Sequence, residues 1–248
     1  MQQYFIKGPC QNPVIIEDKE TIKHMFQVMR LTDGDQVCLV FEDGIKRLAA
    51  VSDSAAHTFT ILQALDQSVE LPVAVTIASG FPKGDKLEWV TQKVTELGAS
   101  AIWGFPADWS VAKWDGKKLA KKQEKLLKIA QGAAEQSKRN IIPEVELFEQ
   151  KSAFLRQLSG FDYVFVAYEE SAKIGEQAAF ATGLKACQPG DSLLFIFGPE
   201  GGLSPQEVQD FEAIGAQMIG LGPRIMRTET APLYVLSAVS YALELAVK

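Results

Sequence analysis

The sequence predicts an α/β protein of two domains, a small β-rich domain over residues 1–70 and a larger α/β domain over residues 71–248. In the first part, short apolar runs are separated by turn signals such as Asp33-Gly34. From Val73 onward, strand-length apolar runs alternate with helical patterns, which is typical of a domain with a largely parallel sheet. The segment Gln67–Pro72 marks the predicted boundary.

The composition is that of an ordinary soluble protein. Of the 248 residues 47% are hydrophobic, which suffices for a sizeable core, and no apolar run approaches the ~20 residues of a membrane span. The amino terminus, MQQYFIKGPC, lacks the basic region and apolar core of a signal peptide. We therefore expect a cytoplasmic protein with no membrane partner.

Cysteine and histidine are too few and too scattered for metal chemistry. The three cysteines are far apart and form no CxxC pair, so neither a disulfide framework nor a zinc site is indicated (Cys10, Cys38, Cys187). Both histidines lie early in the chain (His24, His57). We expect no metal, and no histidine-based acid–base chemistry near glycine-rich turns late in the chain.

The amino-terminal domain is predicted to be β-rich with one helical turn or two at Lys23–Leu31. Its strand-length runs are Tyr4–Ile6, Gln36–Phe41, Lys46–Val51 and Thr58–Leu62. Because its charge balance is acidic, any contact with nucleic acid has to be a narrow basic patch, for which the candidates are Lys7, Lys23, Arg30, Lys46 and Arg47. The alternative is that these are solvated surface charges.

The carboxyl-terminal domain opens with a continuous apolar run at Val73–Ala78 and a helical pattern at Lys83–Leu97. Further strands are predicted at Ala101–Phe105, Tyr163–Ala167, Leu193–Phe197 and Gln217–Leu221. The last helix, Pro232–Val247, has few polar residues. This composition indicates burial in its own domain or against a second subunit.

One basic block stands out in a chain whose formal net charge is −6. Residues 113–139 hold nine basic and three acidic side chains, and Lys117–Arg139 has helical periodicity. A lysine-rich helix face is most often solvated surface, but contrast with the acidic remainder favours a polyanion site. The candidate polyanion-binding residues of this block are Lys117, Lys121, Lys138 and Arg139.

Two glycine-rich turns follow the last two predicted strands. The first, Gly198–Gly202, precedes a helix start in which Ser204 and Glu207 stand as a capping box with Pro205 at the first helical position. The second begins at Gly222-Pro223 and continues as the polar loop Arg224–Thr230, before Ala231-Pro232 opens the last helix.

Both turns follow carboxyl ends of strands, where ligands usually bind in α/β sheets, so we expect them to wall one pocket. The alternative is that they are plain connectors. The chain has no GxxxxGK[ST] and no GxSxG, and its nearest approach to GxGxxG, Gly220–Ile225, lacks the third glycine. The residues instead suit a small polar ligand with an aromatic base.

Five stretches resemble the RsmE family of SPOUT-class methyltransferases, which act on N3 of a uridine in 16S ribosomal RNA. They are GPEGGLSPQEV at 198–208, LGPRIMRTETA at 221–231, KGDKLEWVTQKVTELGAS at 83–100, AAEQSKR at 133–139 and HMFQVMRLTDGD at 24–35. The last stretch is similar to the PUA-like amino-terminal domain of that family.

The resemblance implies a trefoil knot in the carboxyl-terminal domain, S-adenosylmethionine as the cofactor, a homodimer, and an amino-terminal domain that helps to dock RNA. The partner would be 16S ribosomal RNA or the assembled small ribosomal subunit. On matching positions the cofactor would contact Gly198, Glu200, Gly201, Gly202, Leu221, Gly222, Met226, Arg227, Thr228 and Thr230. The sequence departs from the family at Gln2, Gln3 and Trp109, where the resemblance implies arginines that contact RNA.

The implied reaction needs an environment that stabilises an anion. N3 of uridine holds its proton at neutral pH, so methyl transfer requires a base or a group that stabilises charge on the ring oxygens. We hypothesise that Arg227, or else Arg224, stabilises the anion, and that Glu229 or Glu200 orients it or accepts the proton. In the alternative reading, both carboxylates only fix local backbone.

Three other functions stay open at the level of sequence. A SPOUT methyltransferase with another RNA target is the nearest, and a non-catalytic RNA-binding protein would use the same basic surfaces. A nucleotide-dependent oxidoreductase would use the glycine turns for pyrophosphate, but the incomplete fingerprint is unfavourable to it.

Overall fold

The computed structural model describes residues 1–168 and 177–246, which form two compact units. The first unit contains residues 1–70 together with the short segment 134–141, and the second contains residues 71–133 and the chain from 142 onward. The units therefore differ from the continuous ranges predicted from the sequence. Asn140 accounts for the difference, because its side-chain amide donates to the carbonyls of Gly44 and Gln67 and accepts from the Val69 amide.

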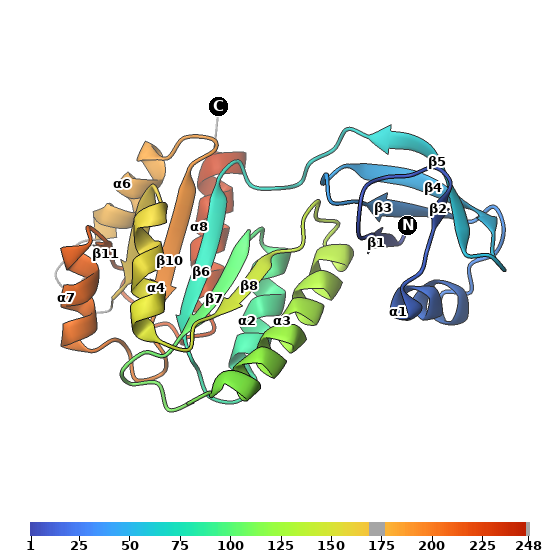
Figure 1. Ribbon diagram of the computed structural model, residues 1–248. Coiled ribbons are helices and arrows are strands. Elements are labelled where there is room, and N and C mark those ends of the chain that lie inside the picture. The colour runs from blue at the N-terminus through green and yellow to red at the C-terminus, as the bar shows by residue number, and fades with distance from the viewer. Residues whose placement is uncertain (169–176, 247–248) are drawn as a thin grey trace. The chain divides into compact units, whose positions relative to one another are not determined.

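The amino-terminal unit is a five-stranded sheet in the order β1-β3-β4-β5-β2 (Figure 1). Its strands are β1 (Gln3–Phe5), β2 (Val14–Ile15), β3 (Gln36–Val40), β4 (Lys46–Asp53) and β5 (Thr58–Leu65). Helix α1 (Lys19–Ile22) continues into the π-helical turn η1 (Lys23–Val28), where a helical turn is predicted. Met25 from this turn is buried against Leu39 and Phe59, so a small core closes one side of the sheet.

The carboxyl-terminal unit is built on six strands that all pair in parallel, in the order β11-β9-β10-β6-β7-β8. The strands are β6 (Ala74–Gly80), β7 (Ala101–Phe105), β8 (Glu144–Leu147), β9 (Tyr163–Ala167), β10 (Ser192–Phe197) and β11 (Gln217–Ile219). The predicted α/β class with a parallel sheet is confirmed. The trefoil knot stays a prediction.

Helices cover both faces of this sheet (Figure 1). The longer ones are α2 (Lys86–Glu96), α3 (Gly116–Gln136), α6 (Gln177–Ala186), α7 (Pro205–Ala213) and α8 (Ala231–Ser240), and the shorter ones are α4 (Lys151–Gln157), η2 (Leu158–Gly160) and η3 (Tyr241–Leu245). One core joins α2, α3, α6 and α8 to one face of the sheet, and a second joins α4 and α7 to the other. No described helix is both long and apolar enough to cross a membrane.

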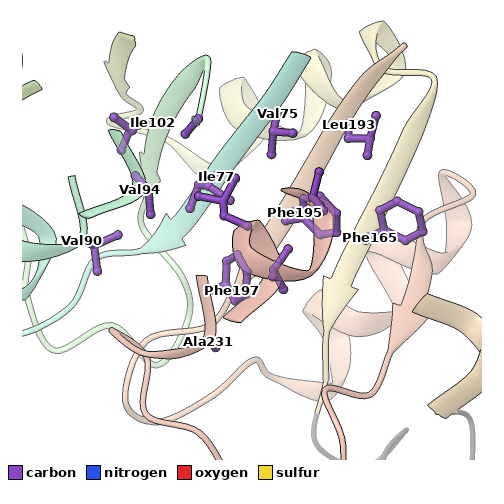
Figure 2. Close-up of a cluster of buried hydrophobic side chains, with 14 of the residues drawn as sticks. Val75, Ile77, Val90, Val94, Ile102, Phe165, Leu193, Phe195, Phe197 and Ala231 are labelled. Atoms are coloured by element: carbon purple, nitrogen blue, oxygen red, sulfur yellow. The ribbon is translucent and has the colours of Figure 1, made fainter. Parts of the chain in front are cut away.

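Strand β10 lies in the middle of the sheet and is buried on both faces, as a continuous apolar run in a parallel sheet predicts. Leu193, Phe195 and Phe197 point into the core that α2 and α8 cover (Figure 2). Leu194 and Ile196 point into the core beneath α4 and α7. The end of β10 is thus fixed from both sides, and it is the point from which the first glycine turn departs.

The buried side chains of β10 stabilise the carboxyl-terminal unit. Leu193→Ala leaves a cavity where the side chain is 0% exposed, and we expect it to lower the free energy of unfolding by about 2–5 kcal/mol. The matched control is Leu127→Ala on α3, whose side chain is 39% exposed and whose loss should cost within about 0.5 kcal/mol. Urea denaturation measures both values, and equal losses would contradict the core assignment.

Candidate active site

A cavity of about 1050 Å³ opens at the carboxyl ends of β9, β10 and β11. Residues of both glycine turns line it, so Gly201 and Gly222 face a common space. The single pocket expected from the sequence is therefore present. Its lining residues are Lys86, Trp109, Ala167, Tyr168, Phe197–Leu203, Pro205, Ile219, Leu221–Thr228 and Ala231.

The first turn is tightly folded back on itself. The Gly202 amide donates to the Pro199 carbonyl at 2.8 Å, and Gly202 has a φ of +79°. A Cβ added to Gly198 would lie 2.7 Å from the carbonyl carbon of Gly202, closer than real Cβ atoms come. Glycine is required at both positions, at one for space and at the other for backbone conformation.

The predicted capping box at the start of α7 is confirmed. The Ser204 hydroxyl oxygen accepts from the Glu207 amide at 3.1 Å, and the Glu207 carboxylate accepts from the Ser204 amide at 2.9 Å. Glu207 is only 1% exposed, so its carboxylate requires hydrogen-bond donors. The Asp108 amide is another donor to the Glu207 carboxylate, at 2.9 Å, and this hydrogen bond ties the loop after β7 to the start of α7.

Asp108 itself closes this polar network. Its carboxylate accepts from the Ser204 hydroxyl at 2.6 Å and forms an ion pair with Lys151, which also lies 3.4 Å from the Glu207 carboxylate. The Lys151 ammonium and the Ser204 hydroxyl lower the pKa of Asp108. The Asp108 carboxylate is thus held by Lys151 and the Ser204 hydroxyl, and the Glu207 carboxylate by the same lysine and two backbone amides.

Glu200 fastens the first turn to the start of α2. Its carboxylate accepts from the Lys83 amide at 3.1 Å and from the Lys86 ammonium at 2.9 Å. Burial acts to raise the pKa of Glu200, but the hydrogen bonds from Lys86 and from backbone amides outweigh burial, so the pKa lies below its ordinary value of 4.5. A carboxylate with a lowered pKa is a weak base, which favours the structural role of Glu200.

The second turn is tied to the first by a side chain. The Thr228 hydroxyl donates to the Gly198 carbonyl at 3.4 Å, and Gly222 has a φ of +94°. The carbonyl of Arg227 accepts from the Thr230 and Ala231 amides at 2.9 and 3.1 Å, which closes the loop immediately before α8. The two turns thus form one wall.

Lys86 bridges the two predicted carboxylates, and the sequence did not single it out as a site residue. Its ammonium lies 2.9 Å from Glu200 and 3.3 Å from Glu229, and hydrogen bonds to these carboxylates, Glu200 above all, raise its pKa. The available signal was its place in the stretch KGDKLEWV. Glu200 lies far along the chain from Lys86, and 117 residues separate it from Lys83, to which it is also hydrogen-bonded. No local pattern could therefore reveal that Glu200 contacts this segment.

The arginines stand at the rim of the cavity. Both Arg224 and Arg227 line it, and the side chain of Arg227 is 85% exposed, with its guanidinium 4.0 Å from Glu229. Glu229 is largely buried at 18% exposure and does not line the cavity. The predicted cofactor-binding residues all line the cavity except Thr230, which is the N-cap of α8.

The candidate RNA-binding residues fall on both units. Lys7, Lys23 and Arg30 are exposed on the amino-terminal unit, and Lys117 and Lys121 are exposed on α3. Lys138 is half-buried, and its ammonium donates to the Glu135 carbonyl at 3.3 Å. On the same helix, Lys122 and Lys125 form ion pairs with Glu88, so part of the basic block is neutralised.

Arg139 is a correction to the expected set of RNA contacts. Its side chain is 2% exposed and forms an ion pair with Glu70, and its carbonyl accepts from the Gln3 side chain at 2.7 Å. A buried guanidinium paired with a carboxylate holds the segment 134–141 in the amino-terminal unit and is not available to a polyanion. Gln3, where the resemblance implies an arginine, is likewise a buried structural residue at 3% exposure.

Comparisons with known proteins agree with this geometry. Residues 69–240 match the family model of the RNA methyltransferase domain, and residues 16–62 match the model of the RNA methyltransferase PUA domain. The ribosomal RNA small subunit methyltransferase E of Bacillus subtilis is 46% identical to this chain over 99% of the chain and 98% of that protein.

Two solved structures extend the comparison. A methyltransferase from Legionella pneumophila in complex with the cofactor S-adenosylmethionine is 28% identical, with a TM-score of 0.82. The ribosomal RNA small subunit methyltransferase E from Neisseria gonorrhoeae, bound to S-adenosylmethionine, is 25% identical, also with a TM-score of 0.82. Each match covers 97% of both chains.

The parallel sheet, the paired glycine turns and these matches make the chain an RNA methyltransferase with an amino-terminal PUA domain. Within that class, it belongs to the ribosomal RNA small subunit methyltransferase E family, abbreviated RsmE.

The bridge made by Lys86 predicts a pH dependence. The lowered pKa of Glu200 contributes stability above pH 4.5, and this contribution is lost as the pH falls through the depressed pKa. Lys86→Met returns that pKa toward 4.5, so we expect the variant to have a Tm about 2–4 °C below the wild type at pH 7. The difference should vanish as the pH falls below the wild-type pKa.

The control for this measurement is Lys93→Met on the same helix, which breaks only the surface pair between Lys93 and Glu96. Thermal unfolding of the three proteins between pH 3 and pH 7 gives the result. A deficit in Lys86→Met that persisted unchanged at pH 3 would contradict the role of the ion pair.

Proposed function

We propose that this protein transfers the methyl group of S-adenosylmethionine to N3 of a uridine in 16S ribosomal RNA. The observation that carries the proposal is one cavity walled by both glycine turns, with an exposed guanidinium at its rim. The names of the Bacillus and Neisseria relatives support a small-subunit ribosomal RNA substrate. The substrate in turn places the reaction in the cytoplasm.

The residues of the cavity fit S-adenosylmethionine. Its volume of about 1050 Å³ is slightly above the about 300–1,000 Å³ typical of ligand pockets. Ile219, Leu221 and Met226 offer an apolar wall for an adenine ring. Gly202 and Gly222, which have no atom within 4 Å of the position of a Cβ, offer open backbone groups that suit the polar parts of the ligand.

Bound S-adenosylmethionine supplies an electrophilic methyl group. The proton of N3 passes to solvent water at the exposed rim, and Arg227 stabilises the negative charge that this loss leaves on the oxygens of the uracil ring, because its guanidinium stands exposed at the rim of the cavity. Arg224, also exposed at the rim, is the second candidate for this role.

The two carboxylates have different roles. Glu200 is engaged by the Lys83 amide and the Lys86 ammonium, and its pKa is lowered, so it fixes the first turn and accepts no proton. Glu229 lies 4.0 Å from the Arg227 guanidinium and 3.3 Å from Lys86, so it orients the arginine from behind the cavity wall. The Thr228 hydroxyl keeps the two turns together during binding.

The two units bind different ligands. The unit of residues 71–133 and 142 onward carries the cofactor site and the dimer interface, and the unit of residues 1–70 and 134–141 is the PUA-like domain that docks RNA. Lys7, Lys23 and Arg30 serve the docking domain, and Lys117 and Lys121 add phosphate contacts from α3. The substrate is either free 16S ribosomal RNA or the assembled small subunit, which a parallel assay with both forms distinguishes.

The direct test is transfer of a tritiated methyl group from S-adenosylmethionine to 16S ribosomal RNA and to small subunits, followed by nucleoside analysis. The proposal predicts radioactive 3-methyluridine. A label on another nucleoside or another RNA would favour the alternative of a methyltransferase with a different target. RNA binding without any transfer of label would favour a non-catalytic RNA-binding protein.

The same assay tests Arg227. Arg227→Ala should lower kcat by about 10²–10³-fold, the loss typical for one group that stabilises a developing anion. Because the side chain is 85% exposed, its removal should leave the Tm nearly unchanged. Arg156→Ala, which removes an exposed arginine of α4 outside the cavity, is the matched control and should stay active. If the Arg227→Ala enzyme is active, Arg227 does not stabilise the anion, and either Arg224 does so or no arginine does.

We also infer that the protein is a homodimer through its carboxyl-terminal helix. Tyr234, Tyr241 and Leu245 are 41%, 65% and 74% exposed, and their spacing of seven and four residues puts them on one helix face. A continuous apolar stripe on an exposed helix face is typical of a subunit interface. The half-buried Ala238 lies between them, and its small side chain permits close approach.

Tyr241→Glu should therefore convert the dimer to a monomer, because a carboxylate would be buried without a partner at the interface. Ile214→Glu, at an apolar position 47% exposed at the end of α7, is the control and should remain dimeric. Sedimentation equilibrium measures both masses. A Tyr241→Glu protein with the wild-type mass would place the interface elsewhere.

A further inference from the structure

Trp109 is an exposed aromatic side chain at the cavity. It follows β7, it is 49% exposed, and it is the tryptophan among the four in the chain that lines the cavity. Trp103 and Trp114 pack against phenylalanines, with Trp114 at 4.3 Å from the Phe81 ring. Trp89 on α2 is exposed to a similar degree, 43%, but outside the cavity.

The backbone around Trp109 is held firmly. Ala107–Ser110 forms a turn in which the Ser110 amide donates to the Ala107 carbonyl at 2.9 Å. Asp108, the preceding residue, is fixed by Glu207, Ser204 and Lys151.

On the other side, Trp109 packs against the first glycine turn. A Cβ added to Gly201 would lie 3.0 Å from the Cβ of Trp109 and 3.4 Å from its carbonyl oxygen. The indole is therefore presented by a fixed backbone, and little conformational entropy remains to be lost when a ligand stacks on it. Its position is set by the same turn that forms the cofactor cavity.

A flat aromatic surface at the mouth of a methyl-donor site suits a nucleobase. RNA bases that leave a stack are commonly received by aromatic side chains, and enzymes that modify a base take it out of its stack to reach it. The loop carries no cation at this position, so the contact would be with a base face and not with a phosphate.

We propose that Trp109 stacks on a base of the RNA substrate at the entrance of the cavity and holds it for methyl transfer. This inference rests on the proposed function and adds to it a residue that contacts the substrate. Arg227 and Trp109 would then share the recognition of the extruded nucleotide, the first through charge and the second through stacking.

The experiment compares the wild type with Trp109→Ala and Trp109→Phe. We expect Trp109→Ala to raise the KM for 16S ribosomal RNA about tenfold or more, the loss expected when one base loses its aromatic partner. Trp109→Phe should recover most of the affinity, because a smaller ring still stacks. The control is Trp89→Ala, which removes an equally exposed indole outside the cavity and should keep the wild-type KM.

A second measurement separates the RNA base from the adenine of the cofactor. Calorimetric titration with S-adenosylmethionine should give a Kd for Trp109→Ala within about twofold of the wild type. A rise in this Kd by the same factor as the KM for RNA would place the indole against the cofactor and overturn the proposal. An unchanged KM for RNA would overturn it as well.

The role of Trp109 in RNA binding can also be tested without methyl transfer. If the wild type transfers no methyl group, the proposed function fails, and fluorescence anisotropy with a labelled 16S fragment still reads the contribution of the indole to RNA binding. Weaker RNA binding by Trp109→Ala with normal binding by Trp89→Ala supports the stacking role. Equal binding by all three proteins contradicts it.

Discussion

The tight turn at Gly198–Gly202 is the constraint on which the rest of the site depends. There is no room for a Cβ on Gly198, so the chain comes back on itself directly after β10. Three other parts of the unit contact this turn: the start of α2 through Glu200, the loop after β7 through Trp109 against Gly201, and the second turn through Thr228. The cavity is the space that these attachments leave open.

The acidic and basic side chains of the site differ in burial. Carboxylates near the first turn are enclosed and receive donors, because an ionised group buried without a partner costs several kcal/mol. Glu207 is the clearest example, with two backbone amides and a nearby Lys151. The guanidinium groups are instead left at the rim, where a polyanion can reach them. Acidic residues thus fix the wall, and the two arginines stand at its exposed rim.

Much of this architecture could be predicted because short-range sequence patterns determine it. Apolar runs of strand length identified the strands of the parallel sheet except β8, whose Glu144–Leu147 segment alternates polar and buried residues at the sheet edge. The capping box at Ser204 is a short-range signal and was found. Contacts between residues far apart in the sequence could not be predicted, because periodicity shows which face of an element is buried but not which element packs against it. Arg139 was assigned to RNA for this reason, although it pairs with Glu70 across 69 residues.

In the proposed function, two separate glycine turns hold one methyl donor between them. A crystal structure of the complex with S-adenosylmethionine tests this most directly. The account predicts that the ligand contacts the Gly198–Gly202 turn and the Leu221–Gly222 backbone at once, with its methyl group directed toward Arg227 at the rim. Ligand bound outside this cavity, or touching only one of the two turns, would contradict it.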